Sequence, residues 1–157
     1  MIAKKLNKVC DKLSELFDGY NVLIYKKAKY SKDGIIDSER KVQLDNRLDI
    51  IVYFLIENGK IKTDNDTLNQ TIDYAITMNV VLNDAKIEIE NTVSCINAIL
   101  FQENIFVTDV DFNSDKNLRS DWKADNDKYP YNYSAIGLKA VIENLNLIEC
   151  NKIDCEK

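Results

Sequence analysis

One stretch of this chain, residues 71–83 with the sequence TIDYAITMNVVLN, alternates between apolar and polar side chains. Successive side chains of a β-strand point to opposite faces, so this spacing predicts a strand with one buried face. A strand of about a dozen residues is long beside the usual five or six. We therefore expect it to reach beyond the core of one domain toward a neighbouring subunit. The buried face is predicted to carry Ile72, Tyr74, Ile76, Met78, Val80 and Leu82.

Two other stretches repeat apolar residues at steps of three and four, which is typical of amphipathic helices. The first covers residues 2–17 and the second covers 84–102. Asn83 or Asp84 is the expected N-cap of the second helix, because a short polar side chain there can accept hydrogen bonds from the first turn.

The most apolar stretch, RLDIIVYFLIEN at 47–58, predicts a central strand covered on both faces. Asn58-Gly59 follows it and is a hairpin signal, so we expect a turn at 58–60. The acidic sequence at 63–69 is expected to be a loop. Further strands are predicted at 20–27, 105–112 and 131–145.

The predicted order is therefore α-β-β-β-α-β-β, which gives an α+β fold with a mostly antiparallel sheet of about five strands and two packed helices. A chain of 157 residues has room for one hydrophobic core. We expect a single domain over 1–157, with extended loops at 31–46 and 113–130.

Composition excludes several kinds of chemistry. The chain has no histidine, which removes Ser-His-Asp and Cys-His catalysis and histidine-ligated metal sites. A net charge of −5 makes it a poor general binder of nucleic acid. No CxxC pair occurs, so no zinc site is predicted. We expect no enzymatic activity, no metal and no cofactor. The cysteines are Cys10, Cys95, Cys150 and Cys155.

The distribution of apolar residues also indicates where in the cell the protein is located. No stretch approaches the roughly 18 apolar residues that span a membrane. The N-terminal residues lack the apolar run of a signal peptide. We therefore expect a cytoplasmic protein with reduced thiols.

The segment around 109–127 is unusually acidic. Asp111, Asn113, Asp115 and Asn117 alternate as in the first half of an EF-hand loop, but Lys116 stands where the loop needs glycine. A solvated acidic loop is therefore favoured over a calcium site. Its candidate functional residues are Asp109, Asp111, Asp115, Asp121, Asp125 and Asp127.

The element order resembles that of the tail-terminator proteins of long-tailed bacteriophages. The similarity lies in an opening amphipathic helix, the apolar strand DIIVYFLIEN, and a long strand, QTIDYAITMNVVLN, that leads into the helix DAKIEIENTVSCINAIL. A strand, a polar loop and a final strand then end the pattern, from FVTDVDFNSD to YNYSAIGLKAVIE.

The resemblance implies a virion protein of the tail or neck that is assembled in the host cytoplasm. Its subunits would form a ring, usually a hexamer, between the tail-tube protein and a head-completion or connector protein. DNA would pass through without specific binding, and no membrane would be involved. The acidic loop would then line the channel or dock a neighbouring neck protein. The alternative is an acidic immunity- or inhibitor-type protein that masks a basic partner.

Overall fold

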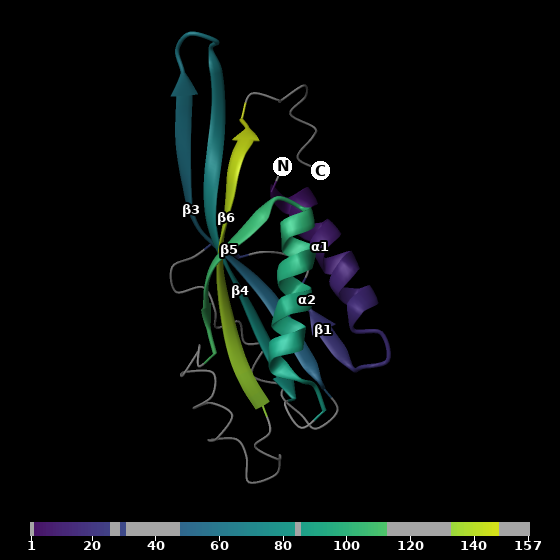
Figure 1. The fold of residues 1–157 in the computed structure, drawn as a ribbon. Helices are drawn as coiled ribbons and strands as arrows, with labels where there is room; N and C mark the ends of the chain where they lie inside the picture. The colour runs from purple at the N-terminus through teal and green to yellow at the C-terminus, as the bar shows by residue number, and fades with distance from the viewer. Residues whose placement is uncertain (1, 26–28, 31–47, 84–85, 113–132, 148–157) are drawn as a thin grey trace.

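The computed structural model describes residues 2–25, 29–30, 48–83, 86–112 and 133–147 (Figure 1). Two helices, α1 (Ile2–Leu16) and α2 (Ile89–Gln102), cover the same face of one sheet. This confirms the predicted α+β order, with one further two-residue strand. The strands are β1 (Val22–Ile24), β2 (Lys29–Tyr30), β3 (Ile50–Asp64), β4 (Asn69–Asn83), β5 (Ile105–Asp111) and β6 (Tyr133–Asn146).

The order of strands across the sheet is β1-β3-β4-β6-β5, and β2 pairs with β3 on the same side as β1. The pairings β3–β4, β4–β6 and β6–β5 are antiparallel, whereas β1 and β2 run parallel to β3. One cross-strand row shows the register: Phe54, Met78, Leu138 and Val110 lie side by side on β3, β4, β6 and β5.

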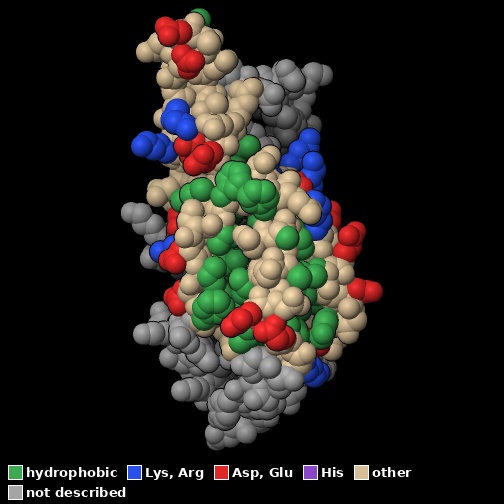
Figure 2. All heavy atoms as spheres, in the orientation of Figure 1, with side chains coloured by type: hydrophobic (Ala, Val, Ile, Leu, Met, Phe, Trp, Pro, Cys, Tyr) green, Lys and Arg blue, Asp and Glu red, His purple; other side chains and the backbone are tan. Residues whose placement is uncertain are grey.

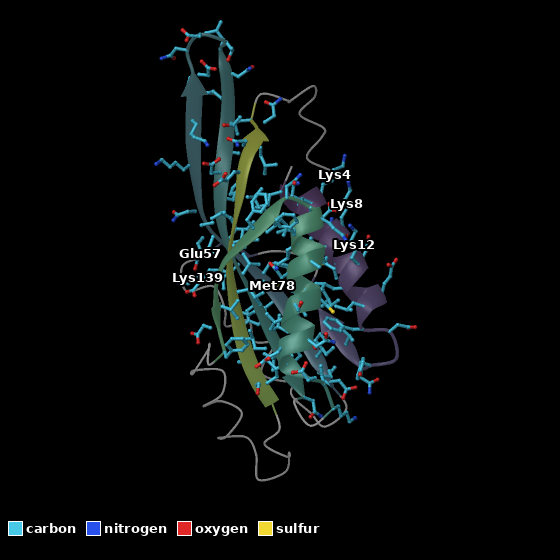
Figure 3. All side chains as sticks on the ribbon, viewed as in Figure 1. Lys4, Lys8, Lys12, Glu57, Met78 and Lys139 are labelled. Atoms are coloured by element: carbon cyan, nitrogen blue, oxygen red, sulfur yellow. The ribbon has the colours of Figure 1, made fainter. Side chains whose placement is uncertain are left out.

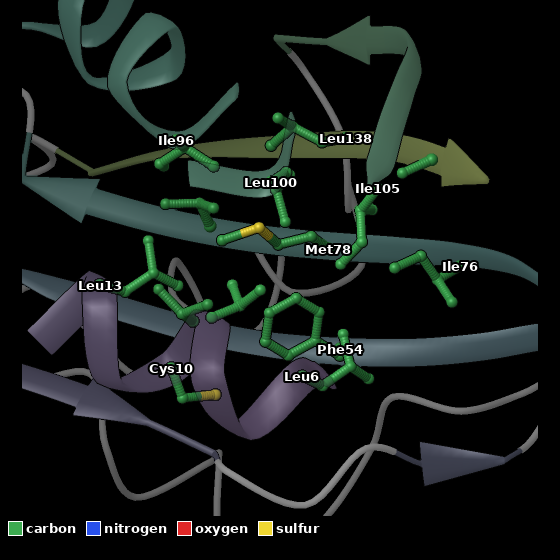
Figure 4. Packing of buried hydrophobic residues seen from close by; sticks show 14 of the residues in the cluster. Leu6, Cys10, Leu13, Phe54, Ile76, Met78, Ile96, Leu100, Ile105 and Leu138 are labelled. Carbon is green, nitrogen blue, oxygen red and sulfur yellow. The ribbon is translucent and has the colours of Figure 1, made fainter. Parts of the chain in front are cut away.

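The main core lies between this row and the two helices (Figure 4). Leu6 and Leu13 of α1 and Leu100 of α2 are buried against the sheet, as their helical spacing predicts. The alternation in β4 is also confirmed. Its buried members facing the helices are Ile72, Ile76, Met78, Val80 and Leu82, and Tyr74 packs against them.

The predicted turn at Asn58-Gly59 is wrong, because β3 continues through these residues to Asp64. A register shift between Ile56 and Asn58 accommodates the extra residue without ending the strand. Gly59 lies opposite Tyr74, and a Cβ there would lie 2.9 Å from Cδ1 of Ile72. The glycine thus serves a close cross-strand approach. The chain reverses instead at residues 65–68, inside the predicted loop at 63–69.

The second helix begins later than predicted, at Ile89. Neither Asn83 nor Asp84 is its cap. The carboxylate of Glu88 accepts hydrogen bonds from the backbone N–H groups of Glu90 and Asn91, at 3.0 and 2.6 Å. Glutamate is an uncommon N-cap residue, so propensity alone favours the shorter polar side chains upstream. Within the described part of the first predicted strand, 20–27, only Val22–Ile24 forms a strand, and residues 26 and 27 lie outside the described residues.

Two lysines of α1 hold the C-terminal end of α2, which positions β5. Lys5 donates to the carbonyl oxygen of Glu103 at 2.6 Å, and Lys12 Nζ lies 2.9 Å from Glu103 Oε2. The hydrogen bond from Lys12 keeps the pKa of the Glu103 carboxyl below its usual range. Cations are favourable at this end of a helix because its carbonyl groups lack intrahelical partners. The bonds link the two helices just before β5 starts.

Neither described helix is both long and apolar enough to cross a membrane. The predicted loops at 31–46 and 113–130 lie outside the described residues, as do Cys150 and Cys155.

Replacing a core residue should destabilise the chain far more than replacing an exposed one. We expect Leu13→Ala or Ile76→Ala to lower the free energy of unfolding by about 2–5 kcal/mol, because each leaves a cavity in the core. Ile61→Ala is the matched control, since Ile61 is 56% exposed, and it should cost less than about 1 kcal/mol. Equilibrium urea unfolding measures all three. Similar values for the three variants would contradict the assigned core.

Candidate functional site

Two of the six candidate aspartates, Asp109 and Asp111, lie in the described part of the chain, on β5. Asp115, Asp121, Asp125 and Asp127 lie outside it. The two described carboxylates are two residues apart and so share one face of β5, and a register shift between Val107 and Asp109 decides which face that is. Asp109 is opposite Lys139 and Asp111 is opposite Gly137 on β6. Both therefore stand on the face of the sheet away from the helices, which we call the far face.

Strand β5 is the last in the sheet, so its outer side pairs with no described strand. Such an edge presents alternate backbone N–H and C=O groups that can bond to another strand. Val110, between the two aspartates, points to the helix side, where Leu138 is its neighbour. β5 thus shows carboxylates on one face and an aliphatic side chain on the other.

A hollow of about 500 Å³ runs between β5 and α2 on the helix side. Figure 2 shows hydrophobic side chains gathered on this face of the molecule. The hollow is open to solvent and mixes apolar and polar side chains, which is typical of a surface that contacts another protein. Its lining residues are Glu90, Val93, Ser94, Asn97, Val107, Thr108, Asp109, Val110 and Leu138.

A smaller cavity of about 330 Å³ lies on the far face, beside the two aspartates. Asn79 lines it, is only 5% exposed, and its Nδ2 has no hydrogen-bond partner among the described residues. The hydroxyl oxygen of Thr77 in the same cavity is also buried, and it has no partner in this part of the chain either. Lys139 stands at its rim, on the side away from the helices (Figure 3). Buried polar groups normally have partners, so this part of the far face has unused hydrogen-bonding capacity.

The β3–β4 hairpin projects beyond both helices as an arm, which we define as residues 57–74 (Figure 1). Every side chain from 57 to 64 is exposed. β2 pairs with β3 only at Leu55 and Ile56, so the outer side of residues 57–64 has no described strand beside it. The arm is therefore a second open edge, on the opposite side of the sheet from β5.

The turn of the arm is built around Asp64. Its Oδ1 accepts hydrogen bonds from the N–H groups of Asp66 and Thr67, at 3.0 and 3.4 Å. A hydrogen bond from the Thr67 side chain, followed by these backbone bonds, lowers the pKa of the Asp64 carboxyl. Leu68 closes the turn with φ +57° and is 78% exposed. A bulky side chain in this left-handed conformation is strained, and strain of this kind often marks a functional position.

Asp73 ties the arm to its neighbours. Its Oδ1 accepts a hydrogen bond from the Asn144 N–H at 2.9 Å, and its Oδ2 lies 3.1 Å from Lys62 Nζ. The bond from Asn144 and then that from Lys62 lower the pKa of the Asp73 carboxyl. One carboxylate on β4 thus links β3 and β6 where the arm leaves the body.

Exposed hydrophobic residues are concentrated on these two surfaces. Large exposed hydrophobic side chains in the described part number seven, and five of them lie on the arm or beside β5. The rings of Phe101 and Phe106 pack edge to face with centroids 5.5 Å apart, at the start of β5. The five residues are Ile61, Leu68, Phe101, Phe106 and Phe112.

Sequence reasoning placed the functional residues in the acidic loop and missed the arm. The alternation of Lys60, Ile61, Lys62 and Thr63 could have revealed it, because it continues the strand pattern past Gly59. Within the described residues, no group of three or more cysteine, aspartate or glutamate side chains could hold a metal ion.

No protein-family model matches the sequence, and no curated protein matches it. Among solved structures, the chain is similar to the sheath/tube terminator, in its extended state, of PVC, an extracellular contractile injection system. The TM-score is 0.35 and the identity 8%, over 95% of this chain and 59% of the terminator chain. This chain therefore spans less than two thirds of that protein. A TM-score this low does not establish a shared fold.

The Asn144 amide should report the protonation of Asp73. We expect its chemical shift to titrate with a midpoint below about 3.9, the usual pKa of aspartate. The reason is that hydrogen bonds from Asn144 and Lys62 favour the carboxylate. The link is therefore complete at neutral pH and is lost only as the pH falls through that lowered value. NMR of the wild type and of Asp73→Asn measures this. A midpoint at or above 3.9, or titration that persists in the variant, would contradict the assignment.

Relieving the strain at Leu68 should stabilise the isolated chain. Asparagine tolerates the left-handed conformation better than leucine. We therefore expect Leu68→Asn to raise the free energy of unfolding by about 1 kcal/mol. Leu68→Ala is the control, because it removes the exposed side chain but keeps a Cβ in the same conformation, and should bring no such gain. Thermal unfolding of the wild type and of the two variants measures the difference, and equal stabilities of all three would argue against strain at Leu68.

Proposed function

We propose that this chain is a non-enzymatic structural subunit that assembles into a closed ring and caps a tail tube. The observation that carries the assembly is the pair of open sheet edges, β5 on one side and residues 57–64 of the arm on the other. One interface between two different edges repeats around a ring until every edge is paired.

Two features of the described residues support a role in contact rather than in chemistry. The surfaces around both edges carry most of the exposed large hydrophobic side chains. The arm adds nothing to the buried cluster from residues 57 to 64, since all of these are exposed. Exposed apolar side chains that gather on a projecting segment are expected to serve an interaction.

The position in a particle follows from the sequence resemblance to phage tail terminators. We propose a hexamer that meets the tail-tube protein on one side and a head-completion or connector protein on the other, as a component of the virion. DNA would pass through the ring without specific binding. The acid-rich surface that begins at Asp109 and Asp111 would then face the channel or a neighbouring neck protein. Like-charge repulsion favours passage of DNA over binding to the wall.

Solution mass and imaging test this function. We expect wild-type chain, alone or with tail tubes assembled from the tube protein encoded beside it, to give closed rings by native mass spectrometry and electron microscopy. Rings should sit at one end of each tube. Tubes whose ends are both blocked by an unrelated protein are the control, because any chain bound to them has adhered non-specifically to the tube wall.

Two outcomes would contradict the proposal. A chain that stays monomeric at all concentrations and leaves tube ends bare is not a terminator. A monomer that instead forms a tight, salt-sensitive complex with one basic protein would favour the inhibitor-type alternative.

A further inference from the structure

The two open edges are similar in length, and their directions allow antiparallel pairing between copies. The open part of β3 spans residues 57–64, and β5 spans Ile105–Asp111. Three antiparallel pairings separate β3 from β5, so the two strands run in opposite directions in one chain. If subunits are related by rotation, β5 of one copy meets β3 of the next as an antiparallel neighbour. The sheet then continues across the interface with the same face toward the helices.

The side chains of the two edges are also complementary. On the arm, Ile61 is paired with Ile72 and so points to the helix side, which leaves Lys60 and Lys62 on the far face. On β5, Val110 points to the helix side, and Asp109 and Asp111 stand on the far face. Each edge therefore has an aliphatic residue between two charged ones, which are lysines on the arm and aspartates on β5. Glu57 and Asp64 stand at the two ends of residues 57–64, so the positive charge is confined to the middle of this stretch.

We propose that residues 60–64 of one copy add to the outer side of β5 of a second copy, with Ile61 opposite Val110. Lys60 then lies opposite Asp111, and Lys62 lies opposite Asp109. This inference rests on the proposed ring and names the contact that closes it. Backbone hydrogen bonds supply the adhesion, and alternate side chains set the register, as in other strand-addition complexes.

The register also accounts for the exposed hydrophobic residues. Ile61 enters the hollow between β5 and α2, where Val93, Val107 and Leu138 form the apolar lining. Because the strands are antiparallel, the turn of the arm arrives at the start of β5. There the exposed Leu68 meets the exposed rings of Phe101 and Phe106. Four exposed apolar side chains would thus fall inside or beside one interface.

Ring closure is compatible with this pairing if the strands are tilted. In one chain Val110 is level with Phe54 of β3 and Met78 of β4. Ile61 is level with Ile72, six β4 positions away, because the register shift at 56–58 takes up one residue of β3. Each copy is therefore displaced by about 20 Å along the strands, at about 3.3 Å per residue. Four strands are about 19 Å wide at about 4.8 Å each. The strands would incline to the ring axis by about 45°, at the upper end of the 35–45° typical of closed barrels.

Exchanging charges across the interface tests the pairing directly. We expect Lys60→Glu or Asp111→Lys alone to weaken ring formation by about tenfold or more, because each places like charges opposite one another. The two changes in one chain should restore it, and so should mixing the two single variants, whose reversed charges then face each other. Lys4→Glu on α1 is the matched control, because it makes the same charge change at an exposed position away from both edges. Sedimentation velocity measures assembly and circular dichroism confirms folding.

A cysteine pair gives an independent readout of the register. We expect Ile61→Cys with Val110→Cys in one chain to form disulfides between copies, seen as a ladder of multimers without reductant. Each single variant, in the same background, is the control for the native cysteines.

The outcomes separate this inference from the function on which it rests. All variants are compared under the condition in which wild type forms rings, free or on tubes. Rings that persist unchanged in both charge variants, with no cross-link between positions 61 and 110, overturn the pairing but leave the ring function standing. Wild-type chain that never forms a ring overturns the function, and the pairing with it.

Discussion

Hydrogen bonding along both sides of β4 is the constraint on which the rest of the sheet depends. β4 pairs with β3 from Asn69 to Leu82 and with β6 from Thr71 to Asn83, so almost none of its backbone is left open. This fixes β3 and β6 over their full length, including the part beyond the helices. Pairing with β4 provides no hydrogen bonds to the outer side of β3, where β1 and β2 reach only as far as Ile56. Among the described strands, the outer side of β3 is therefore unpaired beyond Ile56, where the hairpin runs on past the helices.

The core itself needs only part of this length. On β4 the side chains buried under the helices are Ile76, Met78, Val80 and Leu82, at every second position. Toward the turn, Ile72 and Tyr74 pack over Gly59, and Tyr74 contacts the end of the core. Residues beyond that point are stabilised by backbone pairing and by the bonds of Asp73 and Asp64, which involve few apolar contacts. Polar interactions hold the end of the arm, while Ile61 and Leu68 stay exposed on it.

The strand and helix periods in the sequence were enough to predict the α+β order, the buried face of β4 and the stripe of α1. They failed where a tertiary contact overrides a local signal. Asn58-Gly59 is a turn dipeptide in isolation, but the approach of Ile72 gives the glycine a different role. Glu88 caps α2 although shorter polar side chains precede it.

The aspartates show the same limit at the candidate site. Composition identified Asp109 and Asp111 as part of an acidic segment, but a one-residue register shift at 107–109 decides that both face away from the helices. No sequence period predicts such a shift, because it depends on the pairing with Lys139 and Gly137 on β6.

Charge at an open edge has a second explanation, since lysines and bulges are common devices against unwanted strand pairing. Both edges here have a register shift, at 56–58 on β3 and 107–109 on β5. If the charges served only to prevent unwanted strand pairing, either sign of charge would suffice on each edge. In the proposed register the signs are instead opposite: Lys60 and Lys62 on the arm, Asp109 and Asp111 on β5. Arm with arm centred on Ile61, or β5 with β5 centred on Val110, would place these like charges together, whereas arm with β5 places lysines opposite aspartates. The same side chains thus disfavour symmetric pairs and favour a head-to-tail contact. Only the head-to-tail contact repeats into a ring, and salt should weaken that selectivity over a Debye length of about 8–10 Å.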